Sequence, residues 1–426
     1  MSIFDKLSDE QTWNRFLTYK ALCGNLSPDE ELDLVSYVAN KEYLPVVEKV
    51  RHCTFPDPAK IMVGKMGSEK KRVVYCFPRE ENYLLKLMTF LLLREYEHEF
   101  APNLFSFRVK HGVNKAVRRL KSNDVLPQMH TYKVDIHNYF NSIDIDLLFP
   151  KLDRILHDDP TILNFIKSLL TNPRVVLRDG SVIQEKKGIM AGIPISSFLA
   201  NIFLSDMDWH FHENNTLYLR YSDDIIILQP NSSKLTSDVN WLKNHISSLN
   251  LEINPEKEQW TAPGDEWTFL GLKYHAGVFD ISDISVKKIC DKMRRKHRAL
   301  IRWRHRKGVP PEKAAQKFVA IFNRKLYENR LNSDLTWTRW FFPIINTTTG
   351  LRRIDHYLQQ CVRFIMTESH TNKIYRCSYA QIRSLGYRCL VNEYYKFKTR
   401  SADGGTSTPG NLTPTNPVTE IRHQHP

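Results

Sequence analysis

The sequence lacks the features by which a chain crosses or enters a membrane. No window approaches the roughly 18 uncharged apolar residues that a membrane-spanning helix needs, and the longest apolar stretch, YLLKLMTFLLLREY, contains Lys86 and Arg94. The first ten residues, MSIFDKLSDE, do not combine a basic segment with a following apolar run, as a secretion signal would. We therefore expect no membrane contact and a cytoplasmic location.

Paired cysteines are also lacking. The seven cysteines are odd in number, and none belongs to a CxxC motif. This pattern favours free thiols in the cytoplasm over a zinc site or a disulfide framework. No segment of the sequence repeats another.

Acidic residues are scarce in only one part of the chain. Residues 281–400 contain 27 Lys and Arg but eight Asp and Glu, whereas residues 1–280 contain 33 Lys and Arg and 37 Asp and Glu. The formal net charge of +14 therefore comes from the C-terminal third. A basic region of this size that also carries many aromatic residues predicts a polyphosphate partner. The alternative is a basic surface that is only solvated.

Composition and periodicity divide the chain into residues 1–64, 65–282, 283–400 and 401–426. The first part is predicted to be mostly helical, with one helix starting at Ser27 and Pro28. The second mixes strands and helices, and the third is helical with breaks at prolines. The last part is rich in Gly, Ser, Thr and Pro and has little to bury, which predicts a disordered tail.

The stretch LYLRYSDDIIIL, residues 217–228, is typical of a β-hairpin. Its Tyr, Leu and Ile residues favour strands, and Ser-Asp-Asp is common in turns. Another strand is predicted to end near Asp135. The segments LEINPEKEQW (251–260) and EWTFLGLKYH (266–275) are also predicted to be strands. We therefore expect a sheet in the middle of the chain.

Asp223 and Asp224 place two carboxylates on the turn of that hairpin. Phosphoryl transfer to a nucleic-acid strand uses two divalent ions, and Mg²⁺ prefers carboxylate oxygens. One Asp at a strand end and another on a neighbouring hairpin meet this requirement. We therefore predict that Asp135 and Asp223 bind two Mg²⁺ ions, with the backbone carbonyl of Ile136 as a further ligand. The alternative is a solvated hairpin tip.

Several motifs of this region resemble, in their order and spacing, those of the palm of reverse transcriptases. They are VDIHNYF, GIMAGIPISSFLAN, YSDD, LEINPEKEQ and FLGL. The segments KKRVVYCFP and FSFRVKHG are similar to the fingers motifs that precede the palm in that family. The resemblance covers residues 65–275.

This resemblance implies an α+β fold shaped like a right hand, with fingers, an antiparallel palm sheet backed by helices, and a basic helical thumb. The implied activity is that of an RNA-directed DNA polymerase that uses two Mg²⁺ ions and deoxynucleoside triphosphates. Asp135 and Asp223 would be metal ligands, and Asp224 would support the site and bind metal less directly.

The resemblance also implies residues that bind the nucleotide. Phe140 would stack beneath the sugar and exclude a 2′-hydroxyl; a core phenylalanine is the alternative. Lys71 and Arg72 would neutralise the triphosphate from the fingers. Gly192 would let the backbone approach the base pair, and Lys257 would protonate the departing pyrophosphate. The alternative for Lys71, Arg72 and Lys257 is that each is an exposed side chain without a specific role.

The sequence departs from the family pattern at two positions of AGIPISS. Ala191 stands where Gln is common, and Ser197 stands where Pro is common. The missing amide removes a hydrogen-bonding side chain near the nucleotide pocket. This leaves fidelity and template handling open, but it does not affect the metal chemistry.

Helical spacing after residue 283 predicts a thumb with one apolar face. Near one side of VKKICDKMRRKHRALIRWRHRKG lie Val286, Ile289, Met293, Leu300 and Trp303. Packing of these residues on the palm would leave a basic surface for a duplex. The residues assigned to primer and template are Tyr221, Gly271, Arg294, Arg295, Arg298 and Arg302. Gly271 lies in the turn that resembles the primer grip.

Aromatic residues are concentrated later in the basic third, at Trp337, Trp340, Phe341 and Phe342. We expect these side chains to lie in the core of the thumb. Stacking on unpaired bases is the alternative.

The segments LRRIDHYLQQCVRFIMTESHTNK and SYAQIRSLGYRCLVNEYYKFK are similar to the last helices of prokaryotic defence-associated reverse transcriptases, outside retrons and group II introns. Within that class, the chain resembles the type-two anti-phage system, in which a lone polymerase works with a noncoding RNA. The resemblance implies a monomer that binds this RNA and copies it into cDNA through an RNA–DNA hybrid. It also implies concatemeric cDNA, made by repeated passage over the template.

Three other interpretations stay open. A group II intron-type enzyme normally adds a DNA-binding or Cys/His-rich endonuclease module, which this sequence does not contain. A catalytically silent RNA-binding scaffold would have no need of the three aspartates. A polymerase primed by a protein hydroxyl is compatible with the 18 tyrosines.

Overall fold

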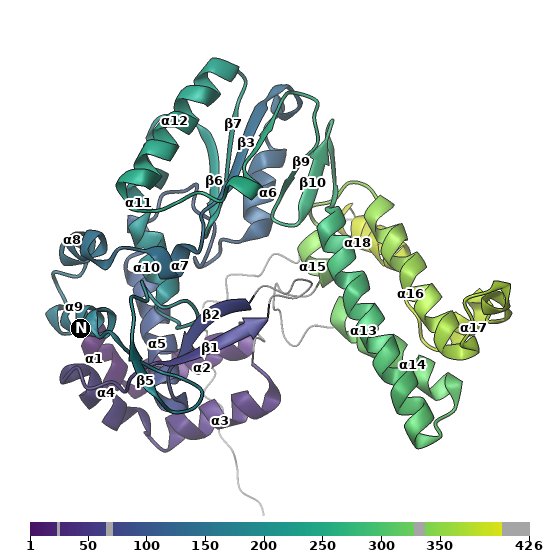
Figure 1. The fold of residues 1–426 in the computed structure, drawn as a ribbon, viewed down its shortest axis with the longest axis horizontal. Helices are drawn as coiled ribbons and strands as arrows, with labels where there is room; N and C mark the ends of the chain where they lie inside the picture. Colours follow the sequence, from purple (N-terminus) through teal and green to yellow (C-terminus); the bar gives the residue numbers. More distant parts are fainter. Residues whose placement is uncertain (24–25, 65–70, 328–336, 403–426) are drawn as a thin grey trace, which may run out of the picture.

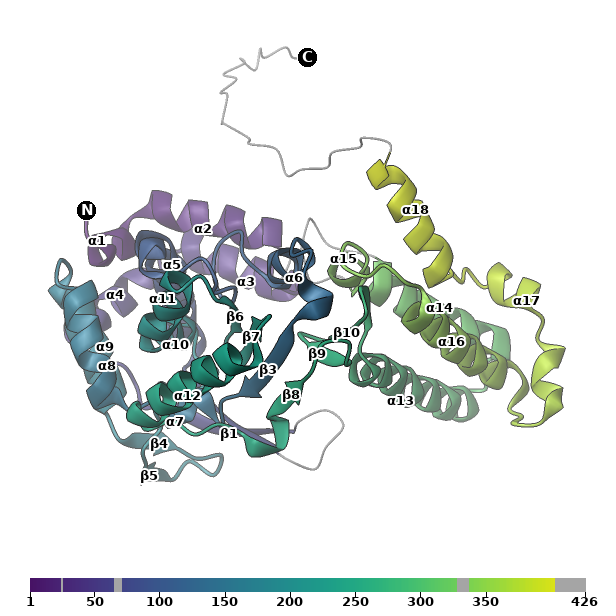
Figure 2. The same cartoon turned by 90° about the horizontal axis from the view of Figure 1, so that it is seen from above.

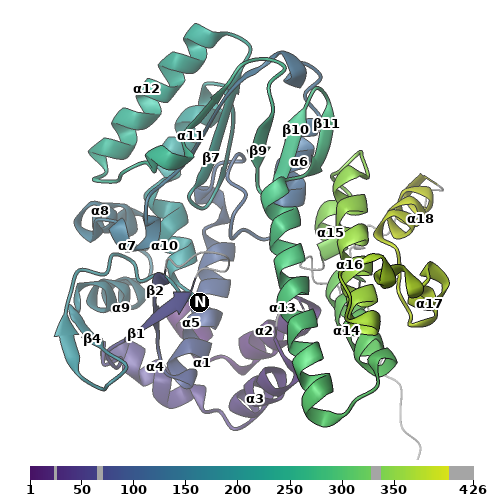
Figure 3. The same ribbon diagram turned by 45° about the vertical axis from the view of Figure 1, so that its right-hand side comes forward.

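The computed structural model describes residues 1–23, 26–64, 71–327 and 337–402 (Figure 1). These residues form a right hand, in which the fingers lie below the palm sheet and the thumb helices stand to one side (Figures 1 and 3). The predicted α+β fold with fingers, palm and thumb is confirmed. Among the described residues, no helix is long and apolar enough to cross a membrane. The predicted tail falls outside the described residues, apart from the last two residues of the final helix.

The palm is a four-stranded sheet with the order β6-β7-β3-β8. Its strands are β3 (His130–Asp135), β6 (Leu217–Tyr221), β7 (Asp224–Gln229) and β8 (Gln259–Thr261). All three neighbouring pairs are antiparallel, as predicted. The helices around this sheet are α6 (Val113–Lys121), α7 (Tyr139–Ser142), α10 (Ser196–Phe203), α11 (Ser205–Glu213) and α12 (Ser232–Ser248).

Both faces of the palm sheet are buried, which explains the unbroken apolar run after the two acids of the hairpin. Ile225 and Ile227 point into a core that they share with α12. Ile226 and Leu228 point into a second core, formed with α6 and the thumb. Because successive side chains of a strand point to opposite faces, a strand covered on both faces must be apolar at every position.

The fingers combine a second sheet with helices. The sheet has the order β2-β1-β4-β5 and contains β1 (Ala59–Gly64), β2 (Lys71–Cys76), β4 (Arg174–Val176) and β5 (Val182–Gln184). The fingers helices are α5 (Arg79–Glu95), α8 (Ile145–Ile155) and α9 (Pro160–Thr171). The predicted boundary at residue 64 falls between two strands that pair along their whole length. Residues 1–64 are mostly helical, as predicted, and end with the first strand of this hairpin.

The N-terminal helices share the core of the fingers. They are α1 (Ile3–Ser8), α2 (Glu10–Cys23), α3 (Pro28–Ala39) and α4 (Tyr43–Arg51). Ser27 caps α3 as predicted, since its hydroxyl accepts from the N–H of Glu30 and the Glu30 side chain accepts from the N–H of Ser27. The hydroxyl of Tyr37 donates to the carbonyl of Glu80 at the start of α5. These helices therefore pack as part of the fingers.

Two predicted strands differ from the structure. Most of residues 251–260 is irregular, because Asn254 and Pro255 start a short 3₁₀ turn, η3 (Pro255–Lys257), and β8 begins only at Gln259. Residues 266–275 form two strands, β9 (Trp267–Phe269) and β10 (Leu272–His275), joined by a tight turn at Leu270 and Gly271. Strand propensity did not reveal the irregular segment before β8, whereas the turn at Gly271 agrees with the turn predicted from FLGL.

A third sheet and a helical bundle form the thumb. Strand β11 (Val278–Ile281) pairs with β10 to complete the sheet. The helices are α13 (Asp283–Lys307), α14 (Pro311–Tyr327), α15 (Trp337–Phe341), α16 (Thr349–Thr367), α17 (Tyr379–Ser384) and α18 (Leu390–Ala402). Helices α13, α14 and α16 lie side by side (Figure 2). This confirms the predicted helical thumb.

The apolar stripe of α13 exists as predicted, but it packs against α14 and α16 in the thumb core, where packing on the palm was expected. Its buried members are Val286, Ile289, Met293 and Leu300, and Trp303 is half-buried against the same core. Of the later aromatic residues, Phe341 and Phe342 are buried, and Trp337 and Trp340 pack partly buried against them. The prediction of core positions for these aromatic residues is confirmed.

The packing of the N-terminal helices predicts the effect of a core deletion. The ring of Trp13 is fully buried and stacks on Tyr43 with the ring centroids 4.9 Å apart, and its indole N–H donates to the carbonyl of Leu7. Trp13→Ala is expected to lower the free energy of unfolding by about 3–5 kcal/mol in urea denaturation. Leu32→Ala, at a side chain 70% exposed on α3, is the control and should change stability by less than about 0.5 kcal/mol. Equal stability of the Trp13 variant and the unaltered chain would show that these helices are not part of the folded core.

Candidate active site

The register of the palm sheet brings the three aspartates together. Strands β3 and β7 pair so that Asp135 lies opposite Asp224. The N–H of Ile136 donates to the carbonyl of Asp223 at 3.1 Å. Residues far apart in the sequence thus meet at one edge of the sheet, as predicted from their strand positions.

Asp223 lies on a two-residue turn. Tyr221 pairs with Asp224 across the hairpin, so only Ser222 and Asp223 connect the strands. Ser222 has a φ of 61°, in the left-handed region that non-glycine residues rarely adopt. A positive φ at the first central position is typical of a hairpin turn whose twist matches the flanking strands. The predicted Ser-Asp-Asp hairpin is therefore confirmed.

Burial and repulsion by neighbouring acids destabilise the charged forms of Asp223 and Asp224. Asp135 is only 5% exposed. Burial, followed by the charges of Asp135 and Asp224, raises the pKa of Asp223 from 3.8 to about 6. Burial also raises the pKa of Asp224, against the opposing effect of Lys133. A group of acids in this state has a strong tendency to bind cations.

One cation of the chain already contacts the group. The ammonium of Lys257 lies 2.5 Å from Oδ2 of Asp135. The irregular segment before β8 places it there, because the N–H of Asn254 donates to the carbonyl of Asp135 and η3 follows directly. Lys257 thus forms an ion pair with Asp135, a predicted metal ligand, and lies within the predicted site.

The donor atoms at this edge fit a hard divalent ion in kind, since they are carboxylate and carbonyl oxygens. However, no group of three or more His, Cys, Asp or Glu side chains within the described ranges is arranged to hold a metal ion. Asp135 is instead paired with Lys257. Metal binding by Asp135, Ile136, Asp223 and Asp224 remains a prediction, and Lys257 contacts Oδ2 of Asp135, one of its two possible ligand atoms.

Phe140 lies just beyond the carboxylates. The chain turns at Asn138, which has a φ of 46°, and enters α7. The Phe140 ring is partly exposed and meets Phe107 edge to face, with centroids 6.2 Å apart. Its backbone carbonyl accepts a hydrogen bond from the N–H of Ile189 at 2.9 Å. This partly exposed position is compatible with the predicted contact to a sugar.

The loop that carries Gly192 connects palm and fingers. The carbonyl of Ala191 accepts a hydrogen bond from the N–H of Tyr75 on β2 at 2.7 Å. The N–H of Ala191 donates to the side chain of Asn141. A Cβ at Gly192, which has a φ of 105°, would lie 2.9 Å from the carbonyl oxygen of Tyr75. Gly192 is therefore required for this close approach to the fingers strand. Lys71 and Arg72 are exposed at the start of the same strand.

Of the predicted primer and template residues, Tyr221 lies on β6 of the palm, and the others lie at the palm–thumb junction and on the thumb. Gly271 has a φ of 82°, and its carbonyl accepts from the N–H of Ser282 at the start of α13. The four arginines are exposed on α13: Arg294, Arg295, Arg298 and Arg302. The structure thus brings together Asp135, Ile136, Tyr221, Asp223, Asp224 and Lys257, and it distributes the other predicted residues over separate elements. Their roles remain predictions.

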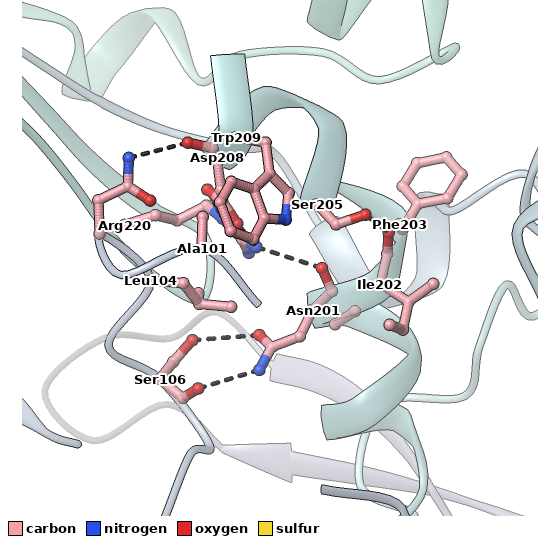
Figure 4. A network of polar contacts seen from close by, with 12 residues as sticks. Ala101, Leu104, Ser106, Asn201, Ile202, Phe203, Ser205, Asp208, Trp209 and Arg220 are labelled. Atoms are coloured by element: carbon pink, nitrogen blue, oxygen red, sulfur yellow. Dashed lines mark hydrogen bonds and ion pairs between the residues drawn. The ribbon is translucent and has the colours of Figure 1, made fainter. Parts of the chain in front are cut away.

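A buried polar network behind the turn was not predicted from the sequence. Arg220 on β6 pairs with Asp208 on α11, and Asn201 and Ser106 complete the arrangement (Figure 4). The sequence feature that could have indicated this network is the charged Arg220 within the otherwise apolar strand LYLRY. Its partners lie in other segments, and sequence spacing alone does not identify them.

The comparison with known proteins identifies the central segment. Residues 63–274, about half of the chain, match the family described as Reverse transcriptase (RNA-dependent DNA polymerase). These residues include the palm sheet, the three aspartates and most of the fingers sheet, whose strand β1 begins before the matched segment. They therefore form a reverse transcriptase domain, the module of an RNA-directed DNA polymerase.

Two curated relatives come from Escherichia coli. The Retron Ec83 reverse transcriptase is 30% identical over 115 residues, which cover 25% of this chain and 35% of that protein. The Retron Ec86 reverse transcriptase is 25% identical over 218 residues, which cover 49% of this chain and 61% of that protein. The chain thus spans less than two thirds of the length of either relative.

Solved structures with a similar fold include apo telomerase from Candida tropicalis, at 13% sequence identity and a TM-score of 0.48. That alignment covers 84% of this chain and 68% of the telomerase chain. Telomerase from Candida albicans in complex with a fragment of telomeric RNA aligns at 12% identity and a TM-score of 0.45, over 88% of this chain and 69% of that chain.

The raised pKa of Asp223 predicts how stability depends on pH without metal. Its pKa of about 6 in the folded chain lies above the ordinary aspartate value of 3.8, which applies to the unfolded chain. Between these values the folded chain holds a proton that the unfolded chain releases, so stability falls as pH rises. In EDTA at pH 7, Asp223→Asn should therefore be more stable than the unaltered chain by up to about 3 kcal/mol. The difference should disappear below about pH 4.

The control for this experiment is Asp124→Asn, at an exposed loop position, which should leave the pH profile unchanged. Added Mn²⁺ should raise the melting temperature of the unaltered chain but not that of the Asp223 variant, because only the former keeps the ligand. An Asp223→Asn protein that is less stable than the unaltered chain at pH 7 in EDTA contradicts the assigned electrostatics.

Proposed function

We propose that the chain is an RNA-directed DNA polymerase that binds a dedicated noncoding RNA and copies it into cDNA, in defence against phage. The observation that carries the proposal is the meeting of Asp135, Asp223 and Asp224 at one sheet edge within a reverse transcriptase domain. A structural role does not account for three neighbouring carboxylates at a strand end, of which Asp223 and Asp224 have pKa values raised by burial and by the neighbouring acids.

Asp135 and Asp223 would hold the catalytic metals, with Asp224 and the carbonyl of Ile136 in support. Two Mg²⁺ ions, when bound, would lower the pKa of the primer 3′-hydroxyl and offset the charge on the transferred phosphate. The β3–β7 pairing fixes the backbones of these ligands before substrate binds. Such preorganisation reduces the rearrangement needed during reaction.

Other residues of the site would bind the nucleotide and complete the reaction. Lys257, which pairs with Asp135, would turn to the departing pyrophosphate and protonate it. Phe140 would pack against the sugar and exclude a 2′-hydroxyl. Lys71 and Arg72 on the exposed end of β2 would contact the triphosphate.

The thumb would hold the RNA and the growing RNA–DNA hybrid. Arg294, Arg298 and Arg302 are exposed on α13, while the apolar side of this helix is buried. Contacts between such arginines and phosphates are independent of sequence and weaken steeply with salt. Gly271 and Tyr221 would support the primer end, since Tyr221 pairs with Asp224 across the hairpin and the carbonyl of Gly271 binds the start of the thumb helix.

The defence role is supported by the similarity to retron reverse transcriptases and by the C-terminal helices that resemble defence-associated enzymes. We assign the chain to the type-two class of these systems, acting in the cytoplasm as a monomer with its RNA. Repeated passage over one template, giving concatemeric cDNA, is part of this proposal. Sequencing of the RNA that co-purifies with the protein tests whether a dedicated noncoding RNA is bound. Sequencing of the DNA made from it tests whether the cDNA is concatemeric.

The first prediction concerns the metal ligands. Asp135→Ala, or Asp223→Ala with Asp224→Ala, should reduce dNTP incorporation to background, because the metals lose their ligands, while RNA binding stays within about twofold. Incorporation is measured with purified protein, its co-purified RNA and labelled dNTPs. Asp146→Ala, at an exposed position of α8, is the matched control and should retain full activity. Primer extension by the Asp135 variant at the normal rate would refute the assignment of Asp135 as a metal ligand. Inactivity of the unaltered chain would instead favour the alternative function of an RNA-binding scaffold.

The second prediction concerns sugar selection. Phe140→Ala should raise the incorporation of ribonucleotides relative to deoxynucleotides by about tenfold or more, because a smaller side chain leaves room for the 2′-hydroxyl. The ratio of kcat/KM values for the two nucleotides is the measurement. Phe149→Ala, at a partly buried phenylalanine of the same core, serves as the control for loss of packing. Unchanged discrimination in the Phe140 variant removes its proposed role.

A further inference from the structure

Arg220 is fully buried although it carries a charge. Its guanidinium pairs with Asp208 in a two-pronged contact, with Nε 2.8 Å from Oδ1 and Nη2 2.5 Å from Oδ2. The hydroxyl of Tyr218 donates to the same carboxylate at 2.8 Å. Asp208 thus balances the charge of Arg220 inside the protein.

The remaining nitrogen of Arg220 reaches the turn that carries Asp223. Nη1 donates to the carbonyl of Ser222 at 3.2 Å. On the other side of the same residue, the N–H of Ser222 donates to Oγ of Ser106 at 2.9 Å. Buried side chains therefore bind both backbone polar groups of Ser222.

Ser222 needs such support because of its backbone conformation. Its φ of 61° places it in the left-handed region, at a turn position where Gly is preferred. Residues other than Gly are strained there and keep this conformation only when their surroundings impose it. Asp223 follows directly, so the conformation of Ser222 determines the direction in which Asp223 leaves the turn.

The Arg220 network (Arg220, Asp208, Asn201, Ser106) also joins several elements behind the turn (Figure 4). Oγ of Ser106 donates to Oδ1 of Asn201 at 3.3 Å, and Nδ2 of Asn201 donates to the carbonyl of Ser106 at 3.0 Å. Nη2 of Arg220 donates to the carbonyl of Asn201 at 3.4 Å. The network therefore anchors the turn to α10, α11 and the loop before α6.

A gain in stability does not explain this arrangement well. Buried ion pairs contribute little net stability compared with apolar side chains of similar size, because both charges lose their hydration. A network that is fully hydrogen-bonded does impose a unique geometry. The geometry that it imposes here is that of Ser222.

We propose that Arg220, Asp208 and Ser106 are positioning residues of the polymerase site. They hold Ser222 in its left-handed conformation, so that the carboxylate of Asp223 is presented to the metals beside Asp135. This inference rests on the proposed function, because it assigns these residues to metal binding in that reaction. Within the described residues, none of these three side chains forms a hydrogen bond or an ion pair with the carboxylates of the metal site, which are those of Asp135, Asp223 and Asp224.

The test compares Mn²⁺ binding and turnover in matched variants. The double variant Arg220→Met with Asp208→Asn removes both charges and keeps an acceptor for Tyr218. It should bind Mn²⁺ about tenfold more weakly in electron paramagnetic resonance titrations of the protein free of nucleic acid. Its kcat for dNTP incorporation should fall by a similar factor, with an unchanged KM for dNTP. Asp206→Asn, an exposed position on the same helix that pairs with Lys151, is the control and should match the unaltered chain.

A rescue experiment separates positioning from a merely structural role. Gly adopts a positive φ without strain, so Ser222→Gly added to the double variant should recover part of the Mn²⁺ affinity. Lack of any recovery would show that the network does not act through the conformation of Ser222.

The remaining outcomes are also decisive. Unchanged Mn²⁺ affinity and kcat in a folded double variant overturn the inference. If the double variant does not fold, Ser106→Ala decides, because it removes the acceptor for Ser222 and leaves the pair of Arg220 and Asp208 in place. Weaker Mn²⁺ binding supports the inference, and unchanged binding overturns it. Failure of the unaltered chain to incorporate dNTPs overturns the proposed function instead, and the Mn²⁺ titrations distinguish the two failures.

Discussion

The antiparallel pairing of β3 with β7 is the constraint on which the site depends. It sets Asp135 opposite Asp224 and joins Ile136 to Asp223 by a backbone hydrogen bond. A shift by one residue would turn every side chain of a strand to the other face. Because both faces of β7 are buried in different cores, such a shift would have to repack the α12 side and the thumb side together. Packing in the two cores thus fixes the register between β3 and β7. This register keeps the carboxylates of Asp135, Asp223 and Asp224 close together.

This gathering of acids is electrostatically unfavourable until a cation binds. Burial and mutual repulsion raise the pKa values of Asp223 and Asp224, and Lys257 offsets part of the charge by pairing with Asp135. The Arg220 network addresses a different problem, since it fixes the backbone of the turn and leaves its net charge unchanged. Strain and like charges concentrated at one edge of a stable sheet are typical of a site that has a chemical function.

The parts of the fold that follow a simple periodicity could be predicted from the sequence. The strand that ends at Asp135, the Ser-Asp-Asp hairpin and the apolar stripe of α13 each depend on residues that are close in sequence. The interrupted segment before β8 and the hairpin split by residue 64 could not be predicted, because turn formation at Pro255 and pairing with β2 decide them. The Arg220 network was missed for the same reason, since Ser106 and Asn201 come from distant segments.

The most direct test of the account is a crystal structure of the protein with primer, template, a non-reactive dNTP analogue and Mn²⁺, with anomalous diffraction data. The account predicts two Mn²⁺ peaks at the palm edge, bound by Asp135 and Asp223, with Lys257 released from Asp135. Anomalous peaks elsewhere in the protein, or none at this edge while nucleotide is bound, would contradict the central claim.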